Sequence, residues 1–286
     1  MFSLGYSTYA TKMLDPFIAL PMIKQIGYNS IEICLSDDWP TYPEKFSLEE
    51  QERLKDLCQE LGFSSPAFFG LIDVCNLDNP KELKKTLGKF EMSRKIHYDE
   101  CPILITTVIG HSAPEWDVGK NLICEKFIKL ADMASDYNVV IAVEPHAGTD
   151  FETPHKAVWL MKQTDHKNLK LDLDISHFFV EGFEIDYSVD VCADYAAMIH
   201  VKDGTKKVEV EGNTTVQYCL PGDGTLDLKV FLSSILRNKL ERLPIYAEVS
   251  VQQSLADGYD PRKVANFCYE ALIKASSYMS LKHNEN

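Results

Sequence analysis

Ile141-Ala142-Val143-Glu144-Pro145-His146 is the stretch from which the fold of this chain can be read. Its first three residues are apolar or small, as in a buried strand, and a carboxylate follows where the strand would end. A similar stretch, Ile245-Tyr246-Ala247-Glu248-Val249-Ser250, occurs about a hundred residues later. Two buried strands that each end in a glutamate predict two carboxylates that face one another across a pocket.

Short apolar runs alternate with longer amphipathic segments along the whole chain. Strands are expected at residues 2–6, 30–35, 65–69, 103–109, 139–143, 169–173, 198–201 and 245–249, with a helix after each. Ser47 to Glu50 is a capping box for one of these helices. Residues 204–224 are long, polar and irregular, which is typical of a functional loop or small excursion.

Eight strand–helix units without a Gly/Pro/Ser-rich linker predict one domain over residues 1–286, of the α/β class. The expected architecture is a single (β/α)8 TIM barrel. A doubly wound open sheet is the alternative, but it would need a Gly-rich phosphate turn, and G-x-G-x-x-G does not occur.

The composition excludes several classes of protein. The net charge of -14 argues against nucleic-acid binding, which requires clustered Lys and Arg. No run approaches twenty apolar residues, so no membrane partner is expected. The eight cysteines form no C-x-x-C pair, and a core of this size needs no disulfides. With no signal peptide at the N-terminus, a cytoplasmic location is predicted.

Polar side chains stand at the ends of the last four predicted strands, where the reactive face of a parallel barrel lies. Because side chains alternate along a strand, an inward Glu144 places Val143 outward, and Asp174 lies opposite to Leu173. The coherent inward set is Glu144, Asp174, His200 and Glu248. Three carboxylates and one imidazole suit Mn²⁺, Mg²⁺ or Co²⁺, whereas Zn²⁺ usually recruits more His or Cys.

Alternative interpretations stay open for several of these residues. Asp172, one pleat deeper, could replace Asp174 as the ligand. Glu144 could instead be a buried acid paired with Lys202, which points the same way as His200. Three further residues lie where they could contact a substrate or serve only the fold, namely Phe69 after the third strand, His111 after the fourth and His146 after the fifth.

The ordered set of motifs resembles the sugar phosphate isomerase/epimerase superfamily of xylose-isomerase-like barrels over nearly the whole chain. The motifs are Gly27 to Ile33, Val143 to His146, Leu173 to His177, Ile199 to Asp203, Leu220 to Gly224 and Ala247 to Val249. Within this family the chain is closest in motif to the ketose 3-epimerase and inosose dehydratase branches. The resemblance implies that Glu144, Asp174, His200 and Glu248 hold the metal, and that His177 contacts the substrate.

Two positions depart from the epimerase pattern. Lys206 stands where the epimerases have an arginine six residues after the metal histidine, and Asp150 stands where they have a glutamate. Both substitutions keep the charge but change the reach, so the sugar that is recognised can differ. Lys202, Lys206 and Asp150 therefore join the candidate substrate-binding residues. Barrels of this family often pair, which implies a homodimer or tetramer.

The implied activity is that of a divalent-metal-dependent sugar or cyclitol isomerase or epimerase. Glu144 and Glu248 would exchange protons next to a carbonyl while the metal stabilises the enediolate. A keto-sugar or inosose dehydratase or lyase on the same site is the alternative. An AP-endonuclease-like barrel would need more His ligands and a basic groove, and a non-catalytic sugar-binding barrel has no need of two opposed bases. No Arg cluster occurs, which favours a non-phosphorylated sugar or polyol substrate.

Overall fold

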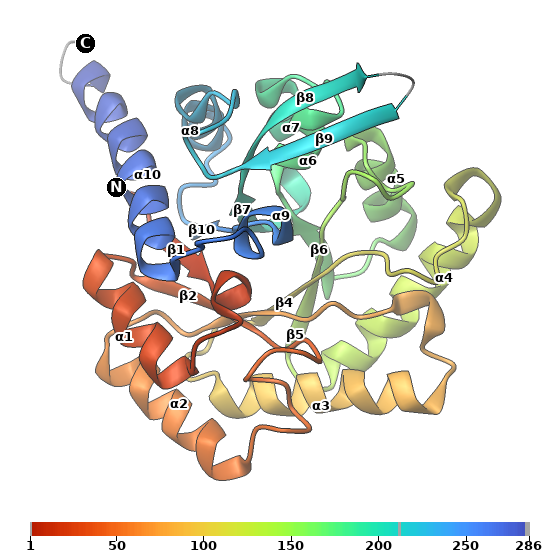
Figure 1. Ribbon diagram of the computed structural model, residues 1–286. Coiled ribbons are helices and arrows are strands. Elements are labelled where there is room, and N and C mark those ends of the chain that lie inside the picture. Colours follow the sequence, from red (N-terminus) through yellow and green to blue (C-terminus); the bar gives the residue numbers. More distant parts are fainter. Residues whose placement is uncertain (1, 211–212, 284–286) are drawn as a thin grey trace.

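Eight parallel strands close into a barrel in the order β1-β10-β7-β6-β5-β4-β3-β2, as predicted (Figure 1). The computed structural model describes residues 2–210 and 213–283, without the side chains of residues 206–210, 213–215 and 279–283. The barrel strands are β1 (Leu4–Ser7), β2 (Ser30–Cys34), β3 (Ala67–Phe69), β4 (Ile103–Thr107), β5 (Val139–Val143), β6 (Leu169–Asp172), β7 (Ala196–Val201) and β10 (Ile245–Ala247).

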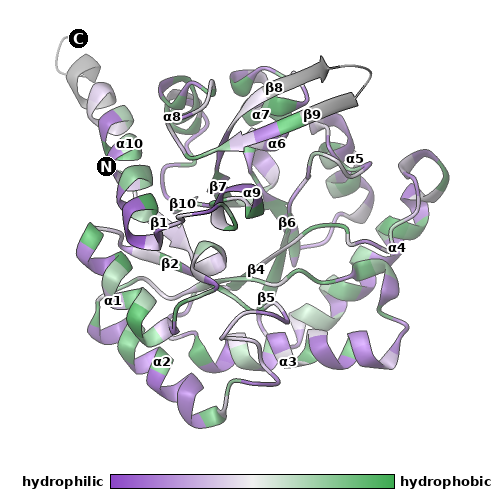
Figure 2. Ribbon diagram, in the orientation of Figure 1, coloured by the Kyte–Doolittle hydropathy of each residue, from purple (hydrophilic) through white to green (hydrophobic). Residues whose placement is uncertain are grey.

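Helices surround the barrel and connect its strands. The longer ones are α1 (Pro16–Ile26), α2 (Leu48–Glu60), α3 (Pro80–Ile96), α4 (Trp116–Ser135), α5 (Pro154–Thr164), α7 (Ile185–Cys192), α8 (Leu228–Arg237) and α10 (Pro261–His283). The capping box before α2 is present, because Ser47 and Glu50 each bond the other's backbone N–H. In Figure 2 hydrophilic and hydrophobic residues alternate along these helices, as expected for helices with one face on the barrel. None of the helices within the described residues is both long and apolar enough to cross a membrane.

Several short elements were not predicted. They are the 3₁₀ turns η1 (Thr8–Thr11) and η2 (Val74–Asn76), and the helices α6 (Ile175–Val180) and α9 (Val251–Ser254). A further 3₁₀ turn, η3 (Ala193–Tyr195), continues α7. α6 begins directly after β6, where the Asp174 carboxylate accepts the Ser176 N–H at 2.8 Å. This helix therefore holds the end of β6, and with it Asp174, in one conformation.

An antiparallel hairpin, β8 (Asp203–Val210) and β9 (Asn213–Cys219), takes the place of the irregular loop expected at 204–224. The prediction of irregular structure was wrong, because β-branched residues such as Thr205, Val208 and Val216 give both arms strand propensity. The hairpin lies outside the barrel, as expected of an excursion, and crosses above α6 and α7 in Figure 1.

A small apolar layer fills the barrel interior below its mouth. It consists of Ala67, Ala142, Met198 and Tyr246, with Leu104 against them. The Tyr246 ring reaches across to β1, where a Cβ on Gly5 would lie 2.3 Å from Tyr246 Cδ1. Only glycine fits there, so the interior is closed and any chemistry is confined to the layer above.

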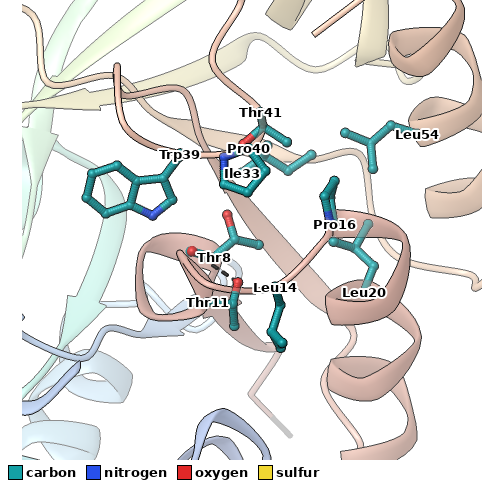
Figure 3. Close-up of a pocket in the computed structure, with 10 residues that line it drawn as sticks. All are labelled: Thr8, Thr11, Leu14, Pro16, Leu20, Ile33, Trp39, Pro40, Thr41 and Leu54. Carbon is teal, nitrogen blue, oxygen red and sulfur yellow. Dashed lines mark hydrogen bonds between the residues drawn. The ribbon is translucent and has the colours of Figure 1, made fainter. Parts of the chain in front are cut away.

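A small apolar void lies outside the barrel, between η1, α1 and the loop that follows β2 (Figure 3). Its walls include Leu14, Leu20, Ile33 and Leu54, together with three threonines and Trp39. With a volume of about 10 Å³ it has room for little more than one water molecule. This void is a packing defect behind Trp39 and contributes nothing to the barrel mouth.

Candidate metal centre at the barrel mouth

Four buried side chains converge at the C-terminal end of the barrel strands. Glu144 follows β5, Asp174 follows β6, His200 lies in β7 and Glu248 follows β10. Each offers one ligand atom, and these four atoms lie within 4.8 Å of one another. The structure thus brings together the four residues that the strand-end pattern selected, while their binding of a metal stays a prediction.

Backbone hydrogen bonds beyond the strand ends position the two glutamates. The Glu144 N–H donates to the Thr107 carbonyl at 2.8 Å, and the Glu248 N–H donates to the Val201 carbonyl at 3.1 Å. Each bond extends the hydrogen-bond ladder of the barrel by one residue. The backbone from which each carboxylate side chain projects is therefore rigid. This rigidity is what a preorganised ligand set requires.

The donor set fits a divalent cation. His200 Nδ1 and Glu248 Oε2 are buried and have no hydrogen-bond partner with acceptable geometry, while Asp174 Oδ2 forms an ion pair with the Lys202 ammonium. His200 Nδ1 lies only 2.8 Å from Glu248 Oε2, yet the two are not aligned as a hydrogen bond. Converging buried polar atoms without such partners are costly unless an ion binds them. Oxygen-rich sets with one imidazole suit Mn²⁺, Mg²⁺ or Co²⁺.

Lys202 places a buried ammonium beside the same carboxylates. Its Nζ lies 2.7 Å from Asp174 Oδ2, 2.9 Å from Glu248 Oε1 and 3.4 Å from Glu144 Oε1. The ion pair of Glu144 with Lys202, considered from the sequence as an alternative, is therefore present. This ion pair is compatible with a bound metal. Three carboxylates and one ammonium have a net charge of -2, which a divalent cation balances.

These contacts decide which groups carry charge. Burial opposes the charge of Lys202, but Asp174 and Glu144 outweigh it and raise the pKa of the ammonium well above its usual value. Burial likewise opposes ionisation of Glu144, and Lys202 and His177 overcome it and hold that pKa well below the usual range. The pKa of the Asp174 carboxyl is lowered against burial by the same two partners. The Glu144 and Asp174 side chains are thus charged and can attract a cation.

Glu32 on β2 orients the imidazole of His200. His200 Nε2 lies 3.1 Å from Glu32 Oε1, and the other Glu32 oxygen accepts the Ser7 hydroxyl. Because a carboxylate can only accept, the Nε2 proton is held there and Nδ1 is the nitrogen that a metal would use. The sequence signal for Glu32 was a lone acid in the apolar strand Ile31-Glu32-Ile33, but its role was not predicted.

We expect Glu32→Gln to weaken metal binding by about tenfold or more, because the neutral amide holds the imidazole less firmly and donates less basicity to it. The measurement is the Kd for Mn²⁺ by calorimetry, with circular dichroism to check the fold. Glu49→Gln, an exposed acid on α2, is the control. Equal affinities for both variants would show that Glu32 does not support the site.

Asp172 lies one layer deeper in the barrel, beside His200. Its Oδ2 is 2.9 Å from His200 Nδ1 and accepts the Thr106 hydroxyl at 3.1 Å. Burial raises the pKa of Asp172 to about 7, with His200 opposing the shift. The sequence left Asp172 and Asp174 as alternatives. The group of potential ligand atoms that includes both glutamates contains one from Asp174.

A pocket of about 210 Å³ opens beside the centre. Its walls are Tyr9, His146, His177, Lys202, Tyr218, Glu248, Ser250, Val251 and Gln252. The predicted substrate contacts His146, His177 and Lys202 are thus at one opening with Glu248. Burial, followed by the His177 charge, lowers the pKa of His146 to about 4, so this imidazole is neutral at pH 7.

Tyr9, Tyr218 and Gln252 were not predicted from the sequence, because they come from η1, the hairpin and α9. Gln252 accepts the Tyr218 N–H at 3.1 Å and donates to the Val216 carbonyl at 3.3 Å. This bonding attaches the hairpin to the loop that carries Glu248. No local sequence motif predicts such a contact between segments that are distant in the sequence.

The remaining predicted substrate contacts lie elsewhere. Asp150 accepts the backbone N–H of Trp116 at the start of α4 and pairs with Lys156 at 2.7 Å, so it does not line the pocket. His111 is exposed in the loop after β4 and is not part of the pocket wall. Phe69 is buried beneath Tyr9, with ring centroids 4.9 Å apart. The side chain of Lys206 lies outside the described residues.

Asp203, the first residue of β8, secures the turn that contains Gly222 to Gly224. Its Oδ1 accepts the N–H groups of Gly204 at 2.7 Å and Leu226 at 2.9 Å, and Oδ2 accepts that of Gly222 at 3.0 Å. A Cβ on Gly224 would lie 2.2 Å from Asp203 Oδ1, so only glycine allows this approach. The motifs 199–203 and 220–224 are therefore one structural unit behind the metal centre.

Comparison with known proteins agrees with the barrel fold. An inosose dehydratase of Lactiplantibacillus plantarum is 25% identical over 162 residues, which are 53% of this chain and 52% of that protein. The chain thus spans about half the length of the curated relatives it matches. The IOLI protein with a binding zinc atom has the same fold, with a TM-score of 0.76, 20% identity and coverage of 97% and 99%.

A D-psicose 3-epimerase from Clostridium cellulolyticum H10, solved with D-tagatose, also shares the fold. Its TM-score is 0.73 at 17% identity, over 97% of this chain and 99% of that one. The model of the family "Xylose isomerase-like TIM barrel" matches residues 20–265. This match covers most of the chain and includes all four residues of the metal centre. The chain therefore belongs to the xylose isomerase-like TIM-barrel family.

Proposed function

We propose that this protein is a divalent-metal-dependent enzyme that moves a proton on the carbon next to the carbonyl of a sugar or cyclitol, as an isomerase or epimerase. The observation that carries the proposal is the approach of Glu144, Asp174, His200 and Glu248 to within 4.8 Å beside an open pocket. Three carboxylates are more than a purely structural ion pair would need.

A divalent cation in this set would supply positive charge that stabilises a developing substrate oxyanion. Glu248 is the better placed of the two bases, since it lines the pocket, whereas Glu144 lies behind His177 and Lys202. One accessible base favours aldose–ketose isomerisation, in which a single carboxylate takes and returns the proton. Epimerisation would require Glu144 to act on the opposite face of the same carbon.

Dehydration is the second candidate, and two observations favour it. The curated relatives include inosose dehydratases, and the pocket holds Lys202 as a charged donor beside the base Glu248. In this reaction Glu248 removes the proton next to the carbonyl, the C–O bond of the hydroxyl one carbon further breaks, and Lys202 protonates the departing oxygen. The products are the unsaturated ketone and water.

A metal-supplemented screen in D₂O tests both candidates. The purified protein with Mn²⁺ is incubated with ketoses, inososes and 3-keto-sugars, and proton NMR follows the carbon next to the carbonyl after removal of the ion. We expect deuterium incorporation that EDTA abolishes. An isomerised product of unchanged composition supports the isomerase, and a product that has lost water supports the dehydratase. Absence of exchange with every substrate would contradict both and favour a binding protein.

A further inference from the structure

A second hollow adjoins the pocket at the barrel mouth. This hollow, called the side groove below, has a volume of about 80 Å³ and lies between η1 and α9. Tyr9 and Val251 line both the side groove and the pocket that contains Glu248. A substrate bound beside the metal centre can therefore reach past these two side chains into the side groove.

Three large apolar side chains of the side groove are exposed to water. Met13 on the η1 side is 85% exposed, while Val251 and Leu255 on the α9 side are 44% and 71% exposed. Single exposed hydrophobic residues are ordinary, but several around one hollow are typical of a surface that binds a ligand. The side groove thus has the character of an unoccupied apolar site.

A stack of aromatic rings joins the metal centre to the side groove. Phe69 lies 6.1 Å from the His200 ring, and its centroid is 4.9 Å from that of Tyr9. Tyr9 in turn stacks on Trp39 at 4.8 Å, and the indole N–H of Trp39 donates to the Tyr9 carbonyl at 3.1 Å. Since Tyr9 and Trp39 both line the side groove, its wall is an extension of the wall beside the metal centre.

Hydrogen bonds hold both sides of the side groove in place. The Tyr259 hydroxyl donates to the Ala10 carbonyl of η1 at 2.8 Å, and Gln253 Nε2 of α9 donates to the Tyr218 carbonyl at 2.9 Å. A site whose walls are already ordered loses less conformational entropy when a ligand binds. The side groove is therefore preformed.

Lys12 is the charged residue of this wall, and its ammonium is engaged in other contacts. It lies 4.5 Å from the centre of the Trp39 ring and 3.4 Å from Asp38 Oδ2. A second sugar ring would need several free donors and acceptors to replace the water around its hydroxyl groups. An apolar group loses no such hydrogen bonds, so the wall favours an apolar ligand.

We propose that the side groove holds an apolar substituent of the substrate, such as the aryl or alkyl group of a glycoside, while the sugar ring occupies the pocket beside the metal centre. The inference rests on the proposed function for the sugar, and it narrows the substrate class to glycosides or ethers with an apolar group. Contact with Met13, Val251 and Leu255 removes apolar surface from water, which favours such ligands by about tenfold or more.

Calorimetry with matched glycosides tests the side groove without any turnover. Phenyl and methyl glycosides of glucose, galactose and xylose are titrated into the full chain in Mg²⁺. We expect the phenyl member of a pair to have a Kd at least about tenfold lower. The double variant Met13→Ser, Leu255→Ser should lose most of this preference. Val118→Ser on α4, which changes a side chain that is 86% exposed and outside the side groove, is the control and should retain it.

Three results of the titrations would overturn the proposal. The first is that no phenyl glycoside binds, and the second is that the double variant keeps the full preference. The third is that a disaccharide binds more tightly than the phenyl glycoside of the same sugar, because the side groove would then recognise hydroxyl groups.

The methyl group of Met13 reports where the phenyl ring binds. The protein is labelled with ¹³C-methyl methionine, and the Met13 signal is assigned with Met13→Leu. An aromatic ring shifts the signals of methyl groups that lie close to its face. We expect phenyl glycosides, but not methyl glycosides, to shift the Met13 signal. A phenyl glycoside that binds without this shift lies elsewhere, which would refute the assignment.

These outcomes separate the inference from the proposed function. If the phenyl preference and the Met13 shift are found but no substrate exchanges a proton, the side groove is right and the activity is wrong. If proton exchange is found but phenyl and methyl glycosides bind equally, only the side groove is wrong. If Leu255→Ser changes the oligomeric state in size-exclusion chromatography and leaves the glycoside preference intact, the hollow is a contact between copies of this chain and the proposal fails.

Discussion

Replacing Glu248 with glutamine is expected to lower kcat by about 10²- to 10⁴-fold, the usual contribution of a positioned general base. Glutamine has the same shape but no negative charge, so it can neither take a proton nor balance Lys202, whose Nζ is 2.9 Å from Glu248 Oε1. The loss is measured as kcat in saturating Mn²⁺ on the best substrate of the screen, with thermal unfolding as the check on the fold.

Metal binding and proton transfer are distinguished by the Mn²⁺ concentration. If Glu248 served only as a ligand, raising Mn²⁺ would restore the rate of the glutamine variant. A low rate at saturation assigns Glu248 to the chemical step. Glu241→Gln, an exposed acid just before β10, makes the same chemical change outside the pocket and should leave kcat unchanged. Full activity of Glu248→Gln would refute its role.

Asp203→Ala should lower the free energy of unfolding by about 3 kcal/mol or more. The substitution removes the acceptor of three backbone N–H groups, and the hydrogen bonds from Gly204 and Leu226 are buried. Each hydrogen bond to a charged group contributes about 1.5–3 kcal/mol. Release of the turn at 222–224 should also weaken metal binding, since His200 and Lys202 closely precede Asp203 in the chain. Urea unfolding and the Kd for Mn²⁺ measure the two effects.

Asp223→Ala is the matched control for this prediction. Asp223 lies in the same turn but is exposed, so its removal should change stability by less than about 0.5 kcal/mol. Asp203→Asn should fall between the two, because its amide oxygen can still accept one or two of the three N–H groups. Similar stability of the Asp203 and Asp223 variants would show that the turn is held by other contacts.

Strand ends were the most informative part of the sequence. Alternation places every second residue on the same face, and parallel strands bring their C-terminal ends to one rim, so the sequence alone groups Glu144, His200 and Glu248. Asp150 shows the limit of this reasoning. Asp150 was assigned to the substrate by its spacing within a loop, where no periodicity determines the direction of a side chain. Its carboxylate instead accepts the backbone N–H at the start of α4.

The hairpin β8–β9 shows a second limit. Its polar composition is typical of a loop, but the structure has two paired strands there. Their pairing depends on cross-strand contacts, on which composition gives no information. As a result Tyr218, which contacts His177 at 2.6 Å, was not predicted to be part of the pocket. Residues brought in by such excursions need the tertiary structure to be identified.

The sequence by itself determined the barrel and the strand ends whose polar side chains converge at its mouth, because both follow from the period of two along strands and from the common rim of a parallel sheet. Only the tertiary structure decided how these groups are charged and oriented. The ion pairs of Lys202 and the contact of Glu32 with His200 depend on closure of the barrel, which fixes how far each strand is shifted along its neighbours. Distances of about 3 Å between groups remote in sequence are set by that closure, and sequence spacing carries no information on them.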